Sequence, residues 1–366
     1  MATNNHIPEF AQRIRNGDVR ALSRAISAVE DHTPESTALL KALFPYSGNA
    51  LLLGLTGAPG AGKSTLANQV ARAYRDRGKT VGIVAVDPTS PFSGGAILGD
   101  RIRMQSHHAD PGIYIRSMAT RGSLGGLAST TADVAMVMGA SGRDIVMIET
   151  VGVGQDEVDI VRLADVTIVV LVPGMGDDVQ TIKAGIMEIA DIFVINKSDR
   201  DGAERVEREI RAMQAITPSR ATALREEAHH RTAPGSLTTG VVAGVGAAEA
   251  GALGAPSPEE SGIRKDDWTP PIVKTIASEG TGIEELLEAI ESYRSYLQQG
   301  DRARARRIEN WRVRIAAMLR DALFQRVLAY YLSAGEAARY AAEVAEHKRD
   351  PYSLVEEIVD ELGKPE

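Results

Sequence analysis

Six short aliphatic runs, separated by longer amphipathic stretches, most restrict how this 366-residue chain can fold. Such runs, about five to eight residues long, are typical of strands buried on both faces of a parallel sheet, and the stretches between them suit covering helices. The runs are ALLLGLTG, TVGIVAVD, DIVMIET, VTIVVLVP, DIFVIN and PIVKTIA. Each ends in polar or glycine-rich residues, at the edge where open α/β sheets bind ligands. We predict a doubly wound, mostly parallel α/β domain over residues 49–298.

Helical patterns flank this domain on both sides. Apolar residues recur at helical spacing from Ile7 to Val29, so residues 1–48 are expected to form a helical extension. Residues 299–366 are also expected to be helical, with an apolar stripe that needs a partner surface, either the main domain or a second subunit. The basic run at 302–307 lacks interleaved aromatic residues and is expected to be a solvated helix face. Residues 217–267 have little apolar periodicity and are expected to form a flexible insertion.

Composition excludes several classes of function. The chain has 41 Lys and Arg against 49 Asp and Glu, a net charge of −8, which argues against binding nucleic acid through overall positive charge. It has no cysteine, which excludes disulfides, zinc–thiolate sites, iron–sulfur clusters and thiol nucleophiles. The paired histidines at 107–108 and 229–230 lack further ligands at matching spacing and are expected to be surface residues. No aliphatic run approaches the ~20 residues of a membrane span, and the N-terminus does not resemble a secretory signal, so we expect a cytoplasmic protein.

The sequence GAPGAGKST matches the phosphate-binding pattern G-x-x-x-x-G-K-[ST], between a predicted strand and a predicted helix. The glycines allow backbone N–H groups to converge on phosphate oxygens, and the helix N-terminus adds the positive end of its dipole. We expect Lys63 to bind the β- and γ-phosphates and the Ser64 hydroxyl to bind Mg²⁺. The predicted nucleotide-binding residues of this loop are Gly57, Ala58, Pro59, Gly60, Ala61, Gly62, Lys63, Ser64 and Thr65.

The sequence NKSD, directly after the run DIFVI, fits the guanine-binding pattern N-K-x-D. A carboxylate at Asp199 can accept from guanine N1–H and N2–H₂, a donor pair that adenine lacks. Lys197 is expected to lie along the base, and Asn196 to support the loop. In the later segment TIASEGTG, we expect the backbone N–H of Ala277 to donate to guanine O6, with Ser278 beside it.

Two acidic residues at strand ends are candidate magnesium ligands. Asp87 ends the run TVGIVAVD and Glu149 ends DIVMIE, so both carboxylates are expected near Ser64 at the carboxyl edge of the sheet. Mg²⁺ usually keeps several waters and binds one or two carboxylates, which suits one or both acids. Each acid has an alternative role as an ordinary helix cap. In the segment ETVGVGQ, we expect Gly152 to offer its N–H to the γ-phosphate.

Two polar segments, 90–104 and 173–185, are expected to be loops that change shape with the nucleotide state. Asp100 and Arg101 are candidate contacts in the first of them. The sequence does not identify the residue that positions the attacking water. The candidates for this role are Gln155, Asp156 and Asp100.

Five sequence blocks, in order, resemble the MeaB/ArgK/MMAA family of G-protein chaperones. The blocks are GAPGAGKST, DPTSPFSGGAILGDRIRM, MATRGSLGGLA, ETVGVGQDE and NKSD. This family belongs to the P-loop branch that includes the signal recognition particle and the hydrogenase and urease maturation GTPases. The resemblance covers about residues 5–216 and 267–335. The insertion at 217–267 departs from the family, which has a shorter link before its W-x-P-P-[IV] block, here residues 268–272.

The resemblance implies a GTPase that uses Mg²⁺ and attends an adenosylcobalamin-dependent acyl-CoA mutase. Methylmalonyl-CoA mutase is the first candidate client and isobutyryl-CoA mutase the second. The GTPase would gate cofactor loading, protect or reactivate the mutase, and hydrolyse GTP slowly without its partner. The resemblance also implies a homodimer joined by the C-terminal helices, and a magnesium site that includes Asp87, Asp100 and Glu149. The candidate catalytic residues are Lys63, Asp100, Glu149 and Gln155.

Three alternative functions remain open at this stage. A nickel-insertion GTPase would need a Cys or His metal site, which the absence of cysteine disfavours. A transport-linked protein kinase would need an acceptor-protein site, which no motif indicates. A scaffold with a purely structural GTP site would keep its function when Lys63 is replaced by alanine.

Overall fold

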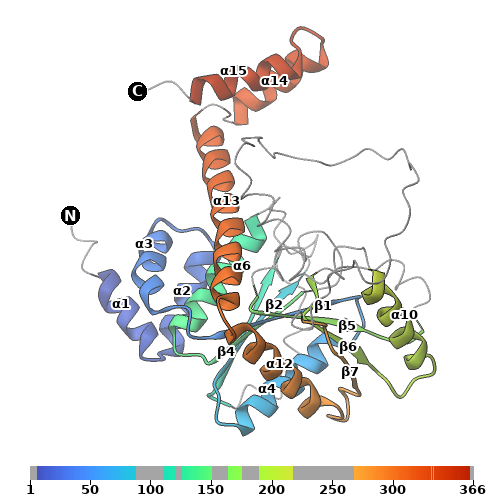
Figure 1. The fold of residues 1–366 in the computed structure, drawn as a ribbon. Helices are drawn as coiled ribbons and strands as arrows, with labels where there is room; N and C mark the ends of the chain where they lie inside the picture. The colour runs from blue at the N-terminus through green and yellow to red at the C-terminus, as the bar shows by residue number, and fades with distance from the viewer. Residues whose placement is uncertain are drawn as a thin grey trace, which may run out of the picture.

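A seven-stranded sheet, in the order β3-β2-β4-β1-β5-β6-β7, forms the core of the protein (Figure 1). Every neighbouring pair is parallel, as predicted. The computed structural model describes residues 6–87, 110–119, 126–150, 164–174, 189–216, 268–330, 332 and 334–362. The strands are β1 (Leu51–Gly57), β2 (Val81–Asp87), β3 (Ile113–Ala119), β4 (Ile145–Glu149), β5 (Val166–Leu171), β6 (Ile192–Asn196) and β7 (Ile272–Thr275). Six of them coincide with the six predicted runs.

The seventh strand, β3, was not predicted from the sequence. It pairs only with β2, so it is the edge strand on that side. Tyr114 and Met118 are buried, whereas the polar residues Arg116 and Ser117 between them are half-buried. An edge strand has polar positions that interrupt the apolar run, and the segment therefore lacks the continuous pattern of the interior strands.

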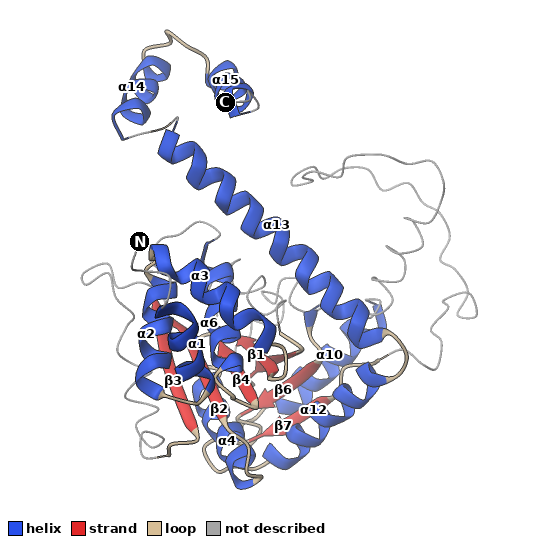
Figure 2. Cartoon of the chain, turned by 90° about the vertical axis from the view of Figure 1, so that its left-hand side faces the viewer, coloured by secondary structure: helices blue, strands red, loops and turns tan. Residues whose placement is uncertain are grey.

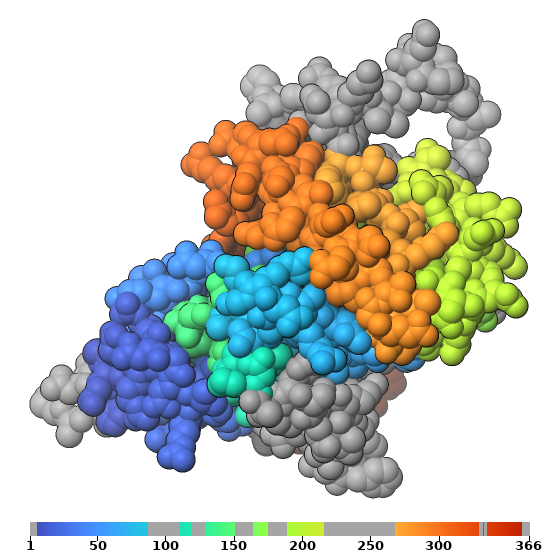
Figure 3. Space-filling view, turned by 90° about the horizontal axis from the view of Figure 1, so that it is seen from below, coloured from blue at the N-terminus to red at the C-terminus, as the bar shows by residue number. Residues whose placement is uncertain are grey.

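Helices cover both faces of the sheet. On one face, α4 and α12 lie side by side in Figure 3, and their side chains share a core with Leu53, Ile168 and Val194. On the other face, α6 packs against β2 and β4, the helices α1, α2 and α3 complete the same core, and α10 packs against β5 and β6. The helices are α1 (His6–Arg15), α2 (Val19–Glu30), α3 (Pro34–Leu43), the 3₁₀ helix η1 (Phe44–Tyr46), α4 (Lys63–Asp76), α6 (Gly126–Ala140), α10 (Ala203–Ile216), α12 (Ile283–Gln298), α13 (Arg302–Tyr330), α14 (Ala334–Ala345) and α15 (Pro351–Leu362).

The order of the strands places β1 at the point where the chain changes direction across the sheet. From β1 the chain crosses to β2 and β3 on one side; after β4 it crosses back over β1 to β5, β6 and β7. Because all pairs are parallel, the carboxyl ends of β1, β4 and β6 lie at the same edge. In open α/β sheets this change of direction leaves a crevice at the carboxyl ends, where ligands bind.

A buried ion pair holds the start of α13 to the opposite, amino edge of the sheet. Arg306 donates to both carboxylate oxygens of Asp191, at 3.0 and 2.7 Å, and to the carbonyl oxygen of Ala164 at 3.2 Å. It also donates to the hydroxyl of Tyr293 on α12. The prediction of a solvated face at 302–307 is therefore wrong for Arg306, although Arg304 and Arg307 are exposed. Sequence could not separate them, because only the buried Asp191 distinguishes one arginine from its neighbours.

The first half of α13 is also fixed to the body of the protein further along. Trp311 packs edge-on against Phe44 of η1, with ring centroids 5.4 Å apart. Arg314 pairs with the largely buried Asp133 of α6. Beyond this point α13 extends away from the sheet and carries α14 and α15 near its far end (Figure 2). The chain therefore has a globular body and a projecting helical arm.

Candidate functional site

The loop that follows β1 has glycine at two positions where no other residue fits. Gly57 has a φ of +141°, and a Cβ there would lie 2.1 Å from the carbonyl oxygen of Val170 on β5. Gly62, which caps α4, has a φ of +88°, and a Cβ there would lie 2.4 Å from Asn196 Nδ2. Both contacts are closer than any side-chain carbon tolerates, and both backbone conformations favour glycine. The pattern G-x-x-x-x-G thus reflects close approach to β5 at one end and to β6 at the other.

Lys63 begins α4 and turns its amine back into the loop. The side chain is buried, and Nζ donates to the carbonyl oxygens of Gly57 at 2.7 Å and Ala58 at 3.0 Å. Gly62 supplies no side chain to cap the first N–H groups of the helix. The amine, the loop and the N-terminus of α4 therefore concentrate positive potential where a phosphate group would bind.

Ser64, in the first turn of α4, meets Glu149 at the carboxyl end of β4. Ser64 Oγ donates to Glu149 Oε1 at 2.5 Å, and both residues are buried. Glu149 is the last residue of β4 and pairs in register with Leu55 of β1, which brings it beside the loop. A hydroxyl and a carboxylate oxygen side by side are hard donors of the kind that Mg²⁺ prefers. The residues fit a magnesium ion, and Asp87 ends the next strand, β2, although its side chain lies outside the described residues.

Asn196 joins three segments of the site. Its Nδ2 donates to the carbonyl oxygen of Ala61 in the phosphate-binding loop at 2.8 Å. Its Oδ1 accepts from Thr275 Oγ1 at 3.1 Å and from the backbone N–H of Ala277 at 3.0 Å. The residue is buried at the end of β6. This amide fixes the position of the loop after β1 relative to the loop after β7.

Lys197 and Asp199 continue from Asn196 at the same edge. Lys197 has a φ of +55°, and its Nζ donates to the carbonyl oxygen of Gly60 at 2.8 Å, which lays the side chain toward the phosphate-binding loop. Asp199 is exposed two residues later, so its carboxylate is accessible to a ligand. The arrangement suits a base that lies against the Lys197 stem and donates to Asp199.

The loop after β7 differs in one respect from the expected base contact. The backbone N–H of Ala277, which we expected to donate to guanine O6, donates to Asn196 Oδ1. A guanine O6 near this N–H would share it with that oxygen. The following residue, Ser278, is exposed, whereas Ala277 is 2% exposed.

Two contacts that hold this loop had no signal in the sequence. Gln69 of α4 donates through Nε2 to the carbonyl oxygen of Ala277 at 3.0 Å, across 208 residues of chain. The Thr275 hydroxyl orients Asn196. Thr275 begins the segment TIASEGTG, whereas Gln69 belongs to no motif, and only the packing of α4 beside the loop brings Gln69 into the site.

Several predicted residues lie outside the part of the chain that the structure describes. They include the switch segment 90–104, most of 173–185, the insertion 217–267 and both histidine pairs. The individual residues are Asp100, Arg101, Gly152, Gln155 and Asp156. Within the described ranges, no helix is both long enough and apolar enough to cross a bilayer.

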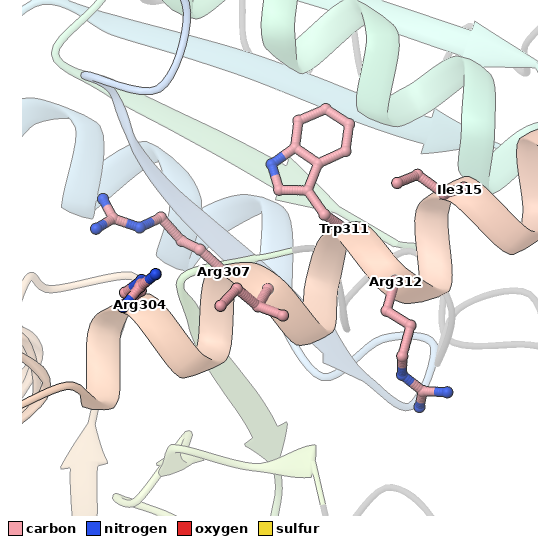
Figure 4. Close-up of a pocket in the computed structure, with 6 residues that line it drawn as sticks. Arg304, Arg307, Trp311, Arg312 and Ile315 are labelled. Carbon is pink, nitrogen blue, oxygen red and sulfur yellow. The ribbon is translucent and has the colours of Figure 1, made fainter.

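A second surface feature lies on α13. Arg304, Arg307 and Arg312 surround Ile308, Trp311 and Ile315 along a shallow groove of about 660 Å³ (Figure 4). Beyond the groove, apolar side chains remain exposed along the arm. They are Met318, Leu319, Leu323 and Phe324 on α13, and Tyr352, Val355 and Val359 on α15.

The parallel sheet, the glycine-rich loop between β1 and α4, and the strand-end Asn-Lys-x-Asp define a P-loop GTPase. The model of the family of methylmalonyl-CoA mutase-associated GTPases called MeaB matches residues 22–331. The chain belongs to this family, and it is a GTPase.

Comparison with individual proteins agrees with this assignment. A protein of Pyrococcus abyssi that is named as a GTPase is 41% identical over 356 residues, which is 97% of both chains. GTPase ArgK of Escherichia coli is 42% identical over 204 residues, 55% of this chain and 62% of that protein. The crystal structure of a LAO/AO transport system kinase has the same fold over the full length of both chains, with a TM-score of 0.61 and 24% identity.

Proposed function

We propose that this GTPase serves an adenosylcobalamin-dependent acyl-CoA mutase, with methylmalonyl-CoA mutase as the first candidate client and isobutyryl-CoA mutase as the second. It would gate the loading of adenosylcobalamin and protect or reactivate the mutase. The observation that carries the proposal is the match over residues 22–331 to a family described as mutase-associated. The nickel-insertion alternative has less support, because the chain has no cysteine to bind nickel. The transport-kinase alternative draws on a likeness of fold alone.

At the phosphates, binding would redirect bonds that the chain now makes with itself. Lys63 Nζ would exchange the carbonyl oxygens of Gly57 and Ala58 for oxygens of the β- and γ-phosphates, which are stronger acceptors because they are charged. The N–H groups of the loop and of the first turn of α4 would hold the same phosphates. Asn196, Lys197 and Asp199 would select guanine at the other end of the site.

Mg²⁺ fits beside the phosphates, on Ser64 Oγ and Glu149, with Asp87 and Asp100 as further candidate ligands. When bound, this ion neutralises charge on the β- and γ-phosphates. Glu149 is buried, and its Oε1 accepts from the Ser64 hydroxyl, which orients that hydroxyl where the ion would bind. The attacking water would be positioned by Gln155, Asp156 or Asp100. Hydrolysis is expected to be slow when the client is absent, because the client completes the site.

We also propose that the protein is a cytoplasmic homodimer whose contacts come from residues 299–366. Residues 1–48 would form a helical extension and residues 49–298 the GTPase domain. Support comes from the exposed apolar side chains of the arm, which are costly in water unless a second copy covers them. Leu319→Asp should therefore give a monomer by light scattering after size-exclusion chromatography. Gln325→Ala, an exposed residue on the same helix, should remain a dimer. A wild-type monomer at the same protein concentration would refute the dimer.

The client is tested by GTP hydrolysis with and without purified methylmalonyl-CoA mutase. We expect the mutase to stimulate hydrolysis several-fold, and we expect Lys63→Ala to abolish this stimulation, since its amine holds the phosphates. Arg72→Ala, an exposed change on the same helix, is the matched control. Normal GTP binding without stimulation by either candidate mutase would refute the client assignment and leave the nucleotide site standing.

A further inference from the structure

The loop between β7 and α12 is held in one backbone conformation by its own hydrogen bonds. Ile276 and Thr281 form an isolated antiparallel bridge, and the N–H of Ile276 donates to the carbonyl oxygen of Thr281 at 3.1 Å. Gly282 has a φ of +79°, and a Cβ there would lie 2.1 Å from the carbonyl oxygen of Lys274. The loop is therefore closed tightly against the end of β7.

Both backbone polar groups of Ala277, in this loop, are held by side chains from other elements. Its N–H is held by Asn196 from β6, at 3.0 Å, and its carbonyl oxygen by Gln69 from α4, also at 3.0 Å. Because a trans peptide is planar, its C=O and the next N–H point in opposite directions. The bond from Gln69 therefore fixes the plane that also contains the N–H of Ser278, and it directs that N–H away from α4.

Because the Ala277 N–H already donates to Asn196, we expect guanine O6 to accept from the N–H of the next residue, Ser278. Ala277 already donates to Asn196, whereas Ser278 is the exposed residue of the pair. Asn196 is bonded to the phosphate-binding loop at Ala61, so the base and phosphate regions are joined through this peptide. An N–H that is fixed in direction before the base binds costs less to order than one that must rotate.

We propose that Gln69 is a positioning residue for guanine recognition, which aims the Ser278 N–H at O6 by holding the Ala277 carbonyl. This role rests on the proposed guanine site at Asn196, Lys197 and Asp199. Gln69 lies on the helix that begins at the phosphate-binding Lys63, so the same helix contacts both ends of the nucleotide site. Its effect is on the base, and its loss should weaken binding without slowing the chemical step.

The test compares Gln69→Glu and Gln69→Leu with wild type. Glutamate keeps the shape but puts an acceptor against the Ala277 carbonyl, and leucine removes the polar group. Either variant should release GDP about fivefold faster, the factor that corresponds to a loss of about 1 kcal/mol for one hydrogen bond. KM for GTP should rise by a similar factor with kcat unchanged. Arg72→Ala on the same helix should behave as wild type.

A second readout separates base positioning from a general weakening of the site. Wild type should bind GDP more tightly than 6-thio-GDP, since sulfur is a weak acceptor for the N–H. The Gln69 variants should lose most of this preference. An equal loss of affinity for both nucleotides, or no loss for either, would overturn the role of Gln69. A wild type that does not prefer guanine to adenine nucleotides would instead overturn the guanine site itself.

Discussion

Replacing Arg306 with methionine removes the positive charge from the buried pair that anchors α13. The side chains of Arg306 and Asp191 are 8% and 3% exposed, so water cannot replace the lost partner. Asp191 would still accept a hydrogen bond from the backbone N–H of Thr167, at 2.8 Å, but its negative charge would be uncompensated. Breaking one side of a buried ion pair costs about 3–5 kcal/mol. We expect the free energy of unfolding to fall by that amount.

A double variant tests whether the uncompensated charge is the cause. Arg306→Met combined with Asp191→Asn leaves no buried charge, and the asparagine oxygen can still accept from Thr167. The double variant should therefore be more stable than Arg306→Met alone, by at least about 2 kcal/mol. Burial alone would lower the pKa of Arg306, but the charge of Asp191 and other nearby groups more than offsets it and raises that pKa, so Arg306 is charged in the wild type throughout the neutral range.

Urea unfolding followed by tryptophan fluorescence suits this measurement. The indole N–H of Trp268 donates to the backbone oxygen of Asp191, at 2.8 Å, so its emission reports on the pair directly. Arg304→Met, an exposed change two residues earlier, should stay within about 0.5 kcal/mol of wild type. The reasoning is refuted if Arg306→Met costs less than about 1 kcal/mol, or if the double variant is no more stable than the single one.

Three further predictions concern the site and the strand ends. Gly57→Ala should abolish binding of fluorescent GDP, because the added carbon would lie 2.1 Å from a β5 carbonyl oxygen, whereas Gly60→Ala, where the added carbon has open space but the φ of +74° strains an alanine, should weaken binding less. Asn196→Ala should lower the thermal midpoint as well as nucleotide affinity, since three bonds are lost, while Asp199→Ala, at an exposed residue, should change only the preference for guanine; equal thermal midpoints would contradict this. Burial raises the pKa of the Asp165 carboxyl above 3.8. Between the unfolded-state and folded-state pKa values, the folded protein therefore binds a proton on Asp165 that the unfolded chain has lost. The contribution of Asp165 to stability falls as pH rises through this range. Asp165→Asn removes that fall. In urea unfolding, the free energy of unfolding of the variant minus that of wild type should therefore be larger at neutral pH than at about pH 4; a smaller difference at neutral pH would refute the predicted direction.

The interior strands and the phosphate-binding loop were predictable because local chemistry fixes them. Continuous apolar runs mark strands buried on both faces, and the positions of Gly57 and Gly62 follow from close approach to other backbone and side-chain atoms. The start of α4 at Lys63 was also predicted. The edge strand β3 was missed because the polar residues Arg116 and Ser117 interrupt its apolar pattern.

Contacts between segments far apart in sequence could not be predicted in the same way. Gln69 bonds to Ala277 across 208 residues, and no local pattern separates it from other polar residues on α4. Arg306 lies in a run of arginines, and only its bond to Asp191 makes it the buried member. The motifs identify which residues bind the nucleotide. They do not identify which residues hold those residues in place.

The anchoring of α13 at one end makes it a lever. At 1.5 Å per residue the helix is about 43 Å long, and its fixed contacts, from Arg306 to Arg314, lie in the first half. The 16 residues beyond Arg314 reach about 24 Å, so a tilt of about 5° at the anchor would carry the far end through ~2 Å. Asp191 stands at one end of β6 and Asn196 at the other, so a single short strand connects the pivot of this lever to the nucleotide site.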